Sequence, residues 1–259
     1  MRFVTLRSLL FLCLIGLVAC SGDGPLTSQA QTAPAASDAG TSAPKHWAAF
    51  LVAGDTAAPV FDHAVDSFSR QLSGPTFTTV HRFSADDSKV AAADLATVDN
   101  LTAAMTTTMA ASPADDGCLF FITSHGGHDG AVLKADDAYL QRLSPVRLGT
   151  ILDASCGKRP TVVIVSACFS GIFLDVAAPN RVILTAARAD RTSFGCGAGF
   201  AYTYYDECLL KYWPTAPDFP QLYESMLGCL SEKERQMNVQ PSLPQASFGA
   251  EVAHLPLPR

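Results

Sequence analysis

Short apolar runs bounded by turn-forming residues recur along the chain. They predict strands at residues 47–53, 77–83, 118–123, 161–167 and 181–186. The centres of the last two runs consist of Val, Ile and Leu alone, so both faces of these strands are apolar. Such strands are typical of the middle of a parallel sheet.

The stretches between these runs carry apolar residues at helical spacing. They predict helices at 60–72, 95–110, 145–154 and 172–176, then two more at 198–211 and 219–237 before a proline-rich tail. Because strands alternate with helices, we expect an α/β fold with a doubly wound, mostly parallel sheet sandwiched by helices. Ligands bind such a sheet outside the carboxyl ends of its strands.

The amino-terminal segment has a different pattern. Two arginines precede an apolar run at 9–19, which is too short to span a bilayer, since a spanning helix needs about 20 apolar residues. The run ends at Leu17-Val18-Ala19-Cys20-Ser21, which resembles a bacterial lipobox. We therefore expect residues 1–19 to be a lipoprotein signal peptide and Cys20 to carry lipid. An ordinary signal peptide with a chance cysteine is the alternative.

Residues 20–44 contain hardly any large apolar side chain and predict a flexible tether behind the lipidated cysteine. Residues 45–259 are numerous enough for one sizeable domain. Ser21 resembles the outer-membrane sorting signal of enteric bacteria. The segment therefore predicts an exported bacterial cell-envelope lipoprotein, held at the outer membrane by its lipid and facing the periplasm.

The composition is that of a core-rich globular protein, with 48% hydrophobic and 16% charged residues. The net charge is −6 and there is no basic run, so we expect no nucleic-acid partner. No CxxC pair suggests zinc or thioredoxin-like chemistry.

Two of the predicted strands end on residues that can carry chemistry. One runs into Ser124-His125-Gly126-Gly127 and the other into Ser166-Ala167-Cys168-Phe169-Ser170-Gly171. Both side chains, His125 and Cys168, are expected at the same edge of the sheet. An imidazole beside a thiol can accept its proton and return one to a leaving amine. The glycines let a substrate carbonyl approach, and the amides of Gly126 and Cys168 would bind the oxyanion.

These motifs resemble those of the legumain-like cysteine peptidases, peptidase family C13, whose fold is shared with caspases and gingipains. Their spacing is comparable to the roughly 50 residues between the caspase pair. The segment at 185–195 resembles the one that walls the specificity pocket in this family. The resemblance extends over about 47–250 and is closest to the shorter bacterial members. It implies a caspase-hemoglobinase-like fold and protein or peptide substrates. A Cys/His mechanism requires no cofactor, and we expect no metal.

The resemblance also implies roles for individual residues. Cys168 would form a thioester with the substrate, and His125 would act as general base and acid. The pocket would involve Asp62 and His63, in the place where eukaryotic legumains carry a basic residue, together with Ser166, Thr192 and Ser193. The asparagine that orients the histidine in those enzymes has no counterpart here. A pocket carboxylate at Asp62 would favour Arg or Lys at P1, whereas a solvated acid at a helix start is the alternative.

Several interpretations stay open at this point. A transpeptidase would resolve the same thioester with an amine, and an inactive peptidase-like binding module of the cell envelope would leave Cys168 unreactive. His125, His128 and Asp129 could instead hold a metal, although the intervening glycines preorganise such a site poorly. The physiological substrate, zymogen processing and the oligomeric state are not readable from the sequence.

Smaller predictions concern the neighbouring residues. Ser170-Gly171 lacks the nucleophile elbow of serine hydrolases, and Ser170 is expected to cap the next helix. The aromatic residues Tyr202, Tyr204, Tyr205, Tyr212 and Trp213 predict a half-buried helix packed on the sheet.

The cysteine count also limits the pairing. Besides Cys168, the domain holds Cys118, Cys156, Cys196, Cys208 and Cys229, so at least one of them must stay unpaired. Which cysteines pair in an oxidising periplasm is left open, and Cys196 with Cys208 is one possible disulfide.

Overall fold

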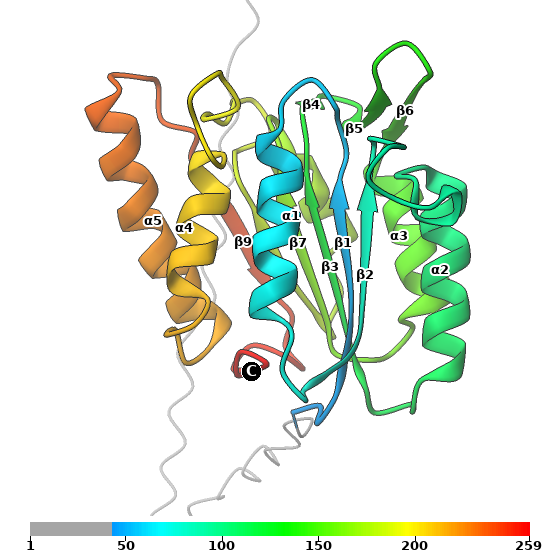
Figure 1. Cartoon of the computed structure of the whole chain (residues 1–259). Helices are drawn as coiled ribbons and strands as arrows, with labels where there is room; N and C mark the ends of the chain where they lie inside the picture. The colour runs from blue at the N-terminus through cyan, green and yellow to red at the C-terminus, as the bar shows by residue number, and fades with distance from the viewer. Residues whose placement is uncertain (1–42) are drawn as a thin grey trace, which may run out of the picture. The chain divides into compact units, whose positions relative to one another are not determined.

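The computed structural model describes residues 43–259. The predicted signal peptide, Cys20 and nearly all of the predicted tether lie outside the described residues. Within 43–259 no helix combines the length and the apolar character that crossing a bilayer requires. The described part is built on a six-stranded sheet with helices on both faces (Figure 1), so the predicted α/β fold is confirmed.

The strands of the central sheet follow the order β2-β1-β3-β7-β8-β9. The parallel members are β1 (Trp47–Ala53), β2 (Phe77–Ser84), β3 (Gly117–Thr123), β7 (Thr161–Ser166) and β8 (Arg181–Thr185), and β9 (Gln245–Phe248) pairs antiparallel with β8. Every residue of β1, β3, β7 and β8 is buried, which is why these strands have continuous apolar sequences. The strand order reverses at β1, which has β2 on one side and β3 on the other.

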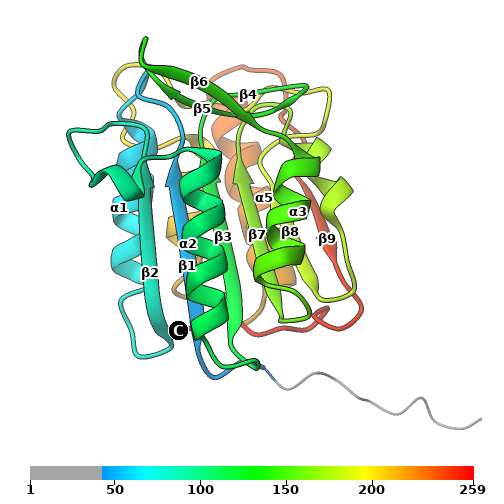
Figure 2. The ribbon, with the colours of Figure 1, turned by 90° about the vertical axis from the view of Figure 1, so that its right-hand side faces the viewer.

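Helices cover both faces of the sheet, as Figures 1 and 2 show. One face is packed by α1 (Val60–Gln71), α4 (Tyr204–Tyr212) and α5 (Phe219–Gln236). The other is packed by α2 (Val98–Ala111), α3 (Pro145–Ser155) and the 3-10 helix η2 (Ser170–Val176), and a short 3-10 turn, η1 (Ala92–Asp94), precedes α2. Alternate residues of each strand therefore enter two separate apolar cores.

A small second sheet lies beyond the carboxyl ends of the central strands (Figure 2). It contains β4 (Gly126–Gly127), β5 (Gly130–Ala135) and β6 (Tyr139–Leu143), all paired antiparallel. Lys134 N donates to Gly54 O at 2.7 Å, which fastens β5 to the end of β1. The glycines and the charged turn of this sheet obscure its short alternating pattern, so these strands were not predicted.

The other boundaries agree with the predicted ones to within a few residues, with two exceptions. The helix expected at 198–211 begins only at Tyr204, because the Thr203 side chain caps it by accepting a hydrogen bond from Asp206 N. The short strand β9 was expected to be part of a proline-rich tail. It is only half-buried and so carries little apolar signal.

Disulfides join Cys118 to Cys156 and Cys208 to Cys229. The possible Cys196–Cys208 pair is therefore wrong, because Cys208 lies on the buried side of α4, where the neighbouring helix α5 offers Cys229 at a Cα–Cα distance of 5.9 Å. Within residues 43–259, Cys168 and Cys196 are free, which confirms that one cysteine of the domain besides Cys168 stays unpaired.

Candidate active site at the carboxyl edge of the sheet

His125 and Cys168 follow two neighbouring strands that are paired in register. Thr123 at the end of β3 pairs with Ser166 at the end of β7, and Ser124 N donates to Ser166 O at 3.0 Å. His125 thus follows Thr123 by two positions, and Cys168 follows Ser166 by two positions. His125 and Cys168 are half-buried, so both reach the surface at the carboxyl ends of neighbouring strands.

Gly126 brings the two motifs into backbone contact. A Cβ atom at this position would lie 2.1 Å from the Cys168 carbonyl oxygen and 3.0 Å from Ala167 Cβ. Real Cβ atoms do not approach a carbonyl oxygen so closely, so only glycine fits here. The chain after His125 therefore runs directly against the peptide of the predicted nucleophile.

The Cys168 sulfur is held by the loop that follows β8. Ser193 N donates to Cys168 Sγ at 3.3 Å. The sulfur also lies 3.6 Å from Ser193 O and 3.8 Å from Ser193 Oγ. Ser193, predicted as a pocket residue, thus contacts the nucleophile, whereas its neighbour Thr192 is exposed in the same loop.

The residue after the nucleophile has a backbone conformation that bulky side chains rarely adopt. Phe169 has a φ of 59°, in the left-handed region, which costs on the order of 1–3 kcal/mol and is common at functional sites. Phe169 N donates to Arg191 O at 2.7 Å, and the ring lies 4.2 Å from that of His128 between centroids. These contacts stabilise the sharp turn that presents Cys168.

His125 is positioned by α1 and β5. Its ring packs edge-on against Phe61, with the centroids 5.3 Å apart. Its carbonyl accepts a hydrogen bond from Val132 N at 2.9 Å, and the Ser124 hydroxyl donates to Val132 O at 2.6 Å. Apolar packing on Phe61 thus orients the imidazole, for which the sequence offers no orienting asparagine.

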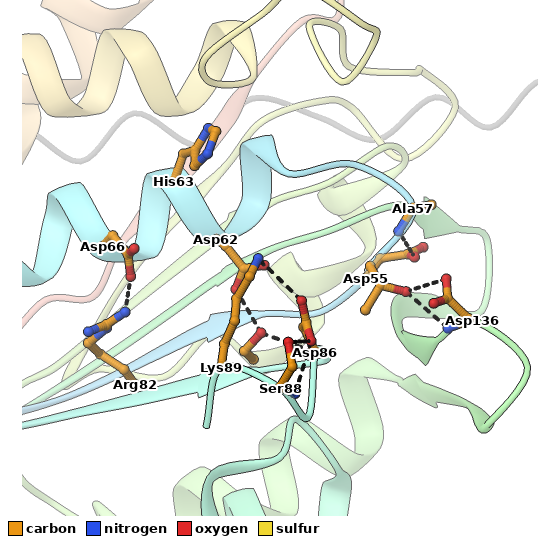
Figure 3. A network of polar contacts seen from close by, with 12 residues as sticks. Asp55, Ala57, Asp62, His63, Asp66, Arg82, Asp86, Ser88, Lys89 and Asp136 are labelled. Carbon is orange, nitrogen blue, oxygen red and sulfur yellow. Dashed lines mark hydrogen bonds and ion pairs between the residues drawn. The ribbon is translucent and has the colours of Figure 1, made fainter. Parts of the chain in front are cut away.

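Asp62 and His63, in the first turn of α1, point in different directions (Figure 3). The Asp62 carboxylate accepts from Ser84 Oγ at 2.7 Å and pairs with Lys89 Nζ at 2.6 Å. His63 Nδ1 lies 3.3 Å from Ala201 O. The contacts of Asp62 are thus with β2 and the loop after it, and a cation already neutralises its charge.

A buried polar cluster lies beneath the dyad. Its members are Thr123, Ser166, Thr203 and Asp206, all with exposed fractions of 4% or less. Thr123 Oγ1 donates to Asp206 Oδ2 at 2.6 Å, and Ser166 Oγ lies 3.2 Å from Thr203 Oγ1. Burial raises the pKa of Asp206 to about 6, and the nearby hydroxyls of Thr123, Ser166 and Thr203 oppose the rise. Among the described residues, none donates to Asp206 Oδ1.

Asp206 was not among the predicted site residues. The available signal was its helical spacing to Leu209 and Trp213, three and seven positions later, which are both buried. That spacing puts a carboxylate on the apolar face of α4. The contact with Thr123 joins segments far apart in the chain and has no sequence pattern.

Other residues near the site have structural contacts. Asp129 pairs with Arg142 at 3.2 Å, and His128 packs on Phe169. Ser170 does not cap η2, so that prediction is wrong: its buried hydroxyl accepts from Ala187 N at 3.1 Å instead. Burial raises the pKa of the Cys196 thiol, and the nearby Cys168 raises it further.

The aromatic residues around α4 form part of the core. Tyr204, Tyr205 and Trp213 are buried in the apolar cluster on the α4 face, and Tyr202 and Tyr212 pack against it. The prediction of a helix packed on the sheet is thus confirmed.

The comparisons with known proteins assign the family. The sequence model of the Peptidase C13 family matches residues 83–227, a segment that contains both His125 and Cys168. The chain belongs to the Peptidase C13 family. Membership makes it a relative of cysteine peptidases, whose substrates are proteins or peptides. A search of curated proteins gives no significant match.

A solved structure supports the fold of this Peptidase C13 member. Protein GSU0716 from Geobacter sulfurreducens is 11% identical, with a TM-score of 0.52 over 78% of this chain and 92% of that one. At such low identity the similarity concerns the α/β fold alone.

Proposed function

We propose that this Peptidase C13 member is a cysteine endopeptidase that cleaves proteins or peptides through a thioester on Cys168. The observation that carries the proposal is the register of β3 and β7, which ends at the pair Thr123 and Ser166. His125 follows Thr123 by two positions, and the free Cys168 follows Ser166 by two positions. Phe169 and Ser193 fix the turn that carries Cys168. A rigid pair of this kind is what acyl transfer by a thiol requires.

The proposed reaction has two stages. His125 accepts the Cys168 proton as the sulfur attacks the scissile carbonyl, and the amides of Gly126 and Cys168 bind the resulting oxyanion. The C–N bond then breaks, and His125 gives the proton to the leaving amine. In the second stage His125 deprotonates a water molecule that attacks the thioester, and the proton returns to sulfur as the acid leaves.

The proposal is tested by labelling the full chain with peptide acyloxymethyl ketones that carry Arg, Lys, Asn or Asp at P1. We expect covalent labelling of the wild type that is lost in Cys168→Ala and in His125→Ala. Cys196→Ala is the matched control, because it removes the other free thiol within residues 43–259, and it should still be labelled. Labelling that persists in Cys168→Ala contradicts the proposal, as does failure of every probe to label folded, reduced protein. The latter outcome would favour an inactive binding module.

Product analysis separates hydrolysis from transpeptidation. With an added amine nucleophile, a hydrolase gives mainly the free acid, whereas a transpeptidase gives the new amide. We expect the free acid, because no cofactor or second substrate enters the proposed reaction. Predominant amide formation would show that the thioester is resolved by amines.

We also propose that the chain is exported and anchored through lipid on Cys20, facing the periplasm at the outer membrane. The lipobox-like segment at 17–21 supports this, and the disulfides Cys118–Cys156 and Cys208–Cys229 are typical of an oxidising compartment. Metabolic labelling with a fatty acid is expected to mark the wild type and Cys13→Ser but not Cys20→Ser. Equal labelling of Cys20→Ser would exclude lipidation at this cysteine.

A further inference from the structure

The buried polar cluster lies on the same face of the sheet as the dyad. Side chains of residues i and i+2 in a strand project to the same side, so Thr123 and Ser166 share the face of Phe121 and Ile164. His125 and Cys168 follow them by two positions. This is the face covered by α1, α4 and α5, and the contact of His125 with Phe61 of α1 agrees with it. A substrate side chain directed inward from Cys168 would therefore run along Ser166.

Asp206 lies on the α4 side of this cluster. Its Oδ2 accepts from Thr123 Oγ1 at 2.6 Å, and the Ser166 hydroxyl lies against Thr203, the cap of the same helix. The cluster thus spans β3, β7 and α4.

Helix capping does not account for the Asp206 carboxylate. In a capping box the acid three residues after the cap would accept from the backbone N–H of the cap residue. Here the carboxylate is bonded to the sheet at Thr123, and Thr203 caps the helix through its own hydroxyl. The carboxylate is fully buried, and Oδ1 has no donor within residues 43–259. A buried carboxylate oxygen without a donor is costly unless a ligand supplies one.

We propose that Asp206 determines specificity in the S1 subsite, where its Oδ1 accepts a hydrogen bond from the guanidinium or ammonium group of an Arg or Lys at P1. The inference rests on the proposed peptidase function and gives it a substrate class. The hydroxyls of Ser166 and Thr203 would flank the cation, whose charge the carboxylate neutralises. Asp62 does not take this role, because Lys89 already pairs with it at 2.6 Å.

The test compares peptide substrates that differ only at P1, with Arg, Lys, citrulline, Asn or Asp, on the full chain. Citrulline has the shape of arginine without its charge. We expect wild-type kcat/KM to be about a hundredfold higher for Arg than for citrulline, because only the arginine guanidinium carries a charge that pairs with the buried carboxylate. Asp206→Asn should reduce the Arg value about a hundredfold and leave the citrulline value within about threefold.

Two further variants make the test specific. Glu207→Gln changes the exposed carboxylate next in sequence, which pairs with Lys233 at 2.7 Å, and should keep the wild-type preference. Asp62→Asn should keep it as well. Loss of the preference in Asp62→Asn but not in Asp206→Asn would overturn the proposal in favour of the acid in α1.

The outcomes also separate this inference from the proposed function. Turnover of citrulline or Asn substrates as fast as Arg substrates by the wild type would refute the role of Asp206 while leaving the peptidase intact, whether or not any variant folds. Absence of turnover and of Cys168 labelling with every P1 residue would instead refute the peptidase itself.

Discussion

Asp206 carries a free-energy cost that its surroundings only partly offset. At neutral pH its carboxylate is charged inside the protein, with hydroxyl partners and no cation. Proteins retain such groups at functional sites more often than elsewhere. If Asp206 binds the substrate, removal of its charge should increase the stability of the folded protein and weaken the recognition of substrates with Arg or Lys at P1.

This cost predicts how stability depends on pH. Burial raises the Asp206 pKa from 3.8 to about 6 in the folded chain. The contribution of Asp206 to the stability of the folded chain is therefore fully present below about pH 4, and it is lost as pH rises through about 6. Since one pKa unit corresponds to 1.36 kcal/mol, the loss is on the order of 3 kcal/mol. Asp206→Asn should thus be more stable than wild type by about this amount at pH 7, and about equally stable at pH 4.

Urea denaturation of both proteins between pH 4 and pH 8 measures this difference. Glu207→Gln serves as the control, since an exposed carboxylate should give a difference that is small and nearly independent of pH. A stability difference between Asp206→Asn and wild type that is the same at pH 4 and pH 7 would contradict the assigned pKa shift.

The residues of the site differ in whether the sequence predicts them. Cys168 and His125 could be proposed from the sequence because each ends an apolar strand and is followed by glycine or by a turn. The resemblance to legumains predicts Asp62, in α1, as the acid for a basic P1 side chain. The neutralising Lys89 and the partner of Asp206, Thr123, both depend on contacts between distant segments, which no local pattern encodes.

At the scale of elements, the site depends on how closely β3 and β7 approach after their last paired residues. Gly126 lies at this junction, where a Cβ would meet the Cys168 carbonyl oxygen at 2.1 Å. Gly126→Ala should therefore separate the two motifs. A shift of about 1 Å can reduce activity about a hundredfold, so we expect a loss of this order in kcat/KM.

Gly228→Ala is the matched control, because a Cβ at that helical position meets no atom within 4 Å. It should retain activity and stability. Peptide hydrolysis and thermal denaturation of both variants provide the comparison. Wild-type activity in Gly126→Ala would mean that the backbone contact with Cys168 is not needed for catalysis.

The elements differ in how well the sequence predicts them. The central strands are buried on both faces and have unbroken apolar sequences, so their positions were predicted to within one or two residues. The sheet β4–β6 and the strand β9 are short and partly exposed, and their pairing depends on the central sheet beneath them. The start of α4 is set by the Thr203 cap, a polar signal that hydrophobic spacing does not contain.

At the scale of the whole molecule, the two dyad residues come from parts of the chain that are joined through the small sheet and α3. The turn between β5 and β6 lies between them in sequence, and residues 136–138 are exposed. The Cys118–Cys156 disulfide connects β3, before this turn, to the end of α3, after it. A cut in the turn would therefore divide the chain between His125 and Cys168 without releasing either part.

The molecule is thus built to tolerate a two-chain form. After cleavage at a protease site introduced at 136–138, the protein should migrate on a denaturing gel as one species without reductant and as two fragments with reductant. Since the β3–β7 hydrogen bonds remain, the nicked protein is expected to keep most of its peptidase activity in the oxidised state. In Cys118→Ala/Cys156→Ala the fragments would be held by noncovalent contacts alone, and dilution or mild urea should then abolish activity in the nicked protein well before it does so in the intact chain.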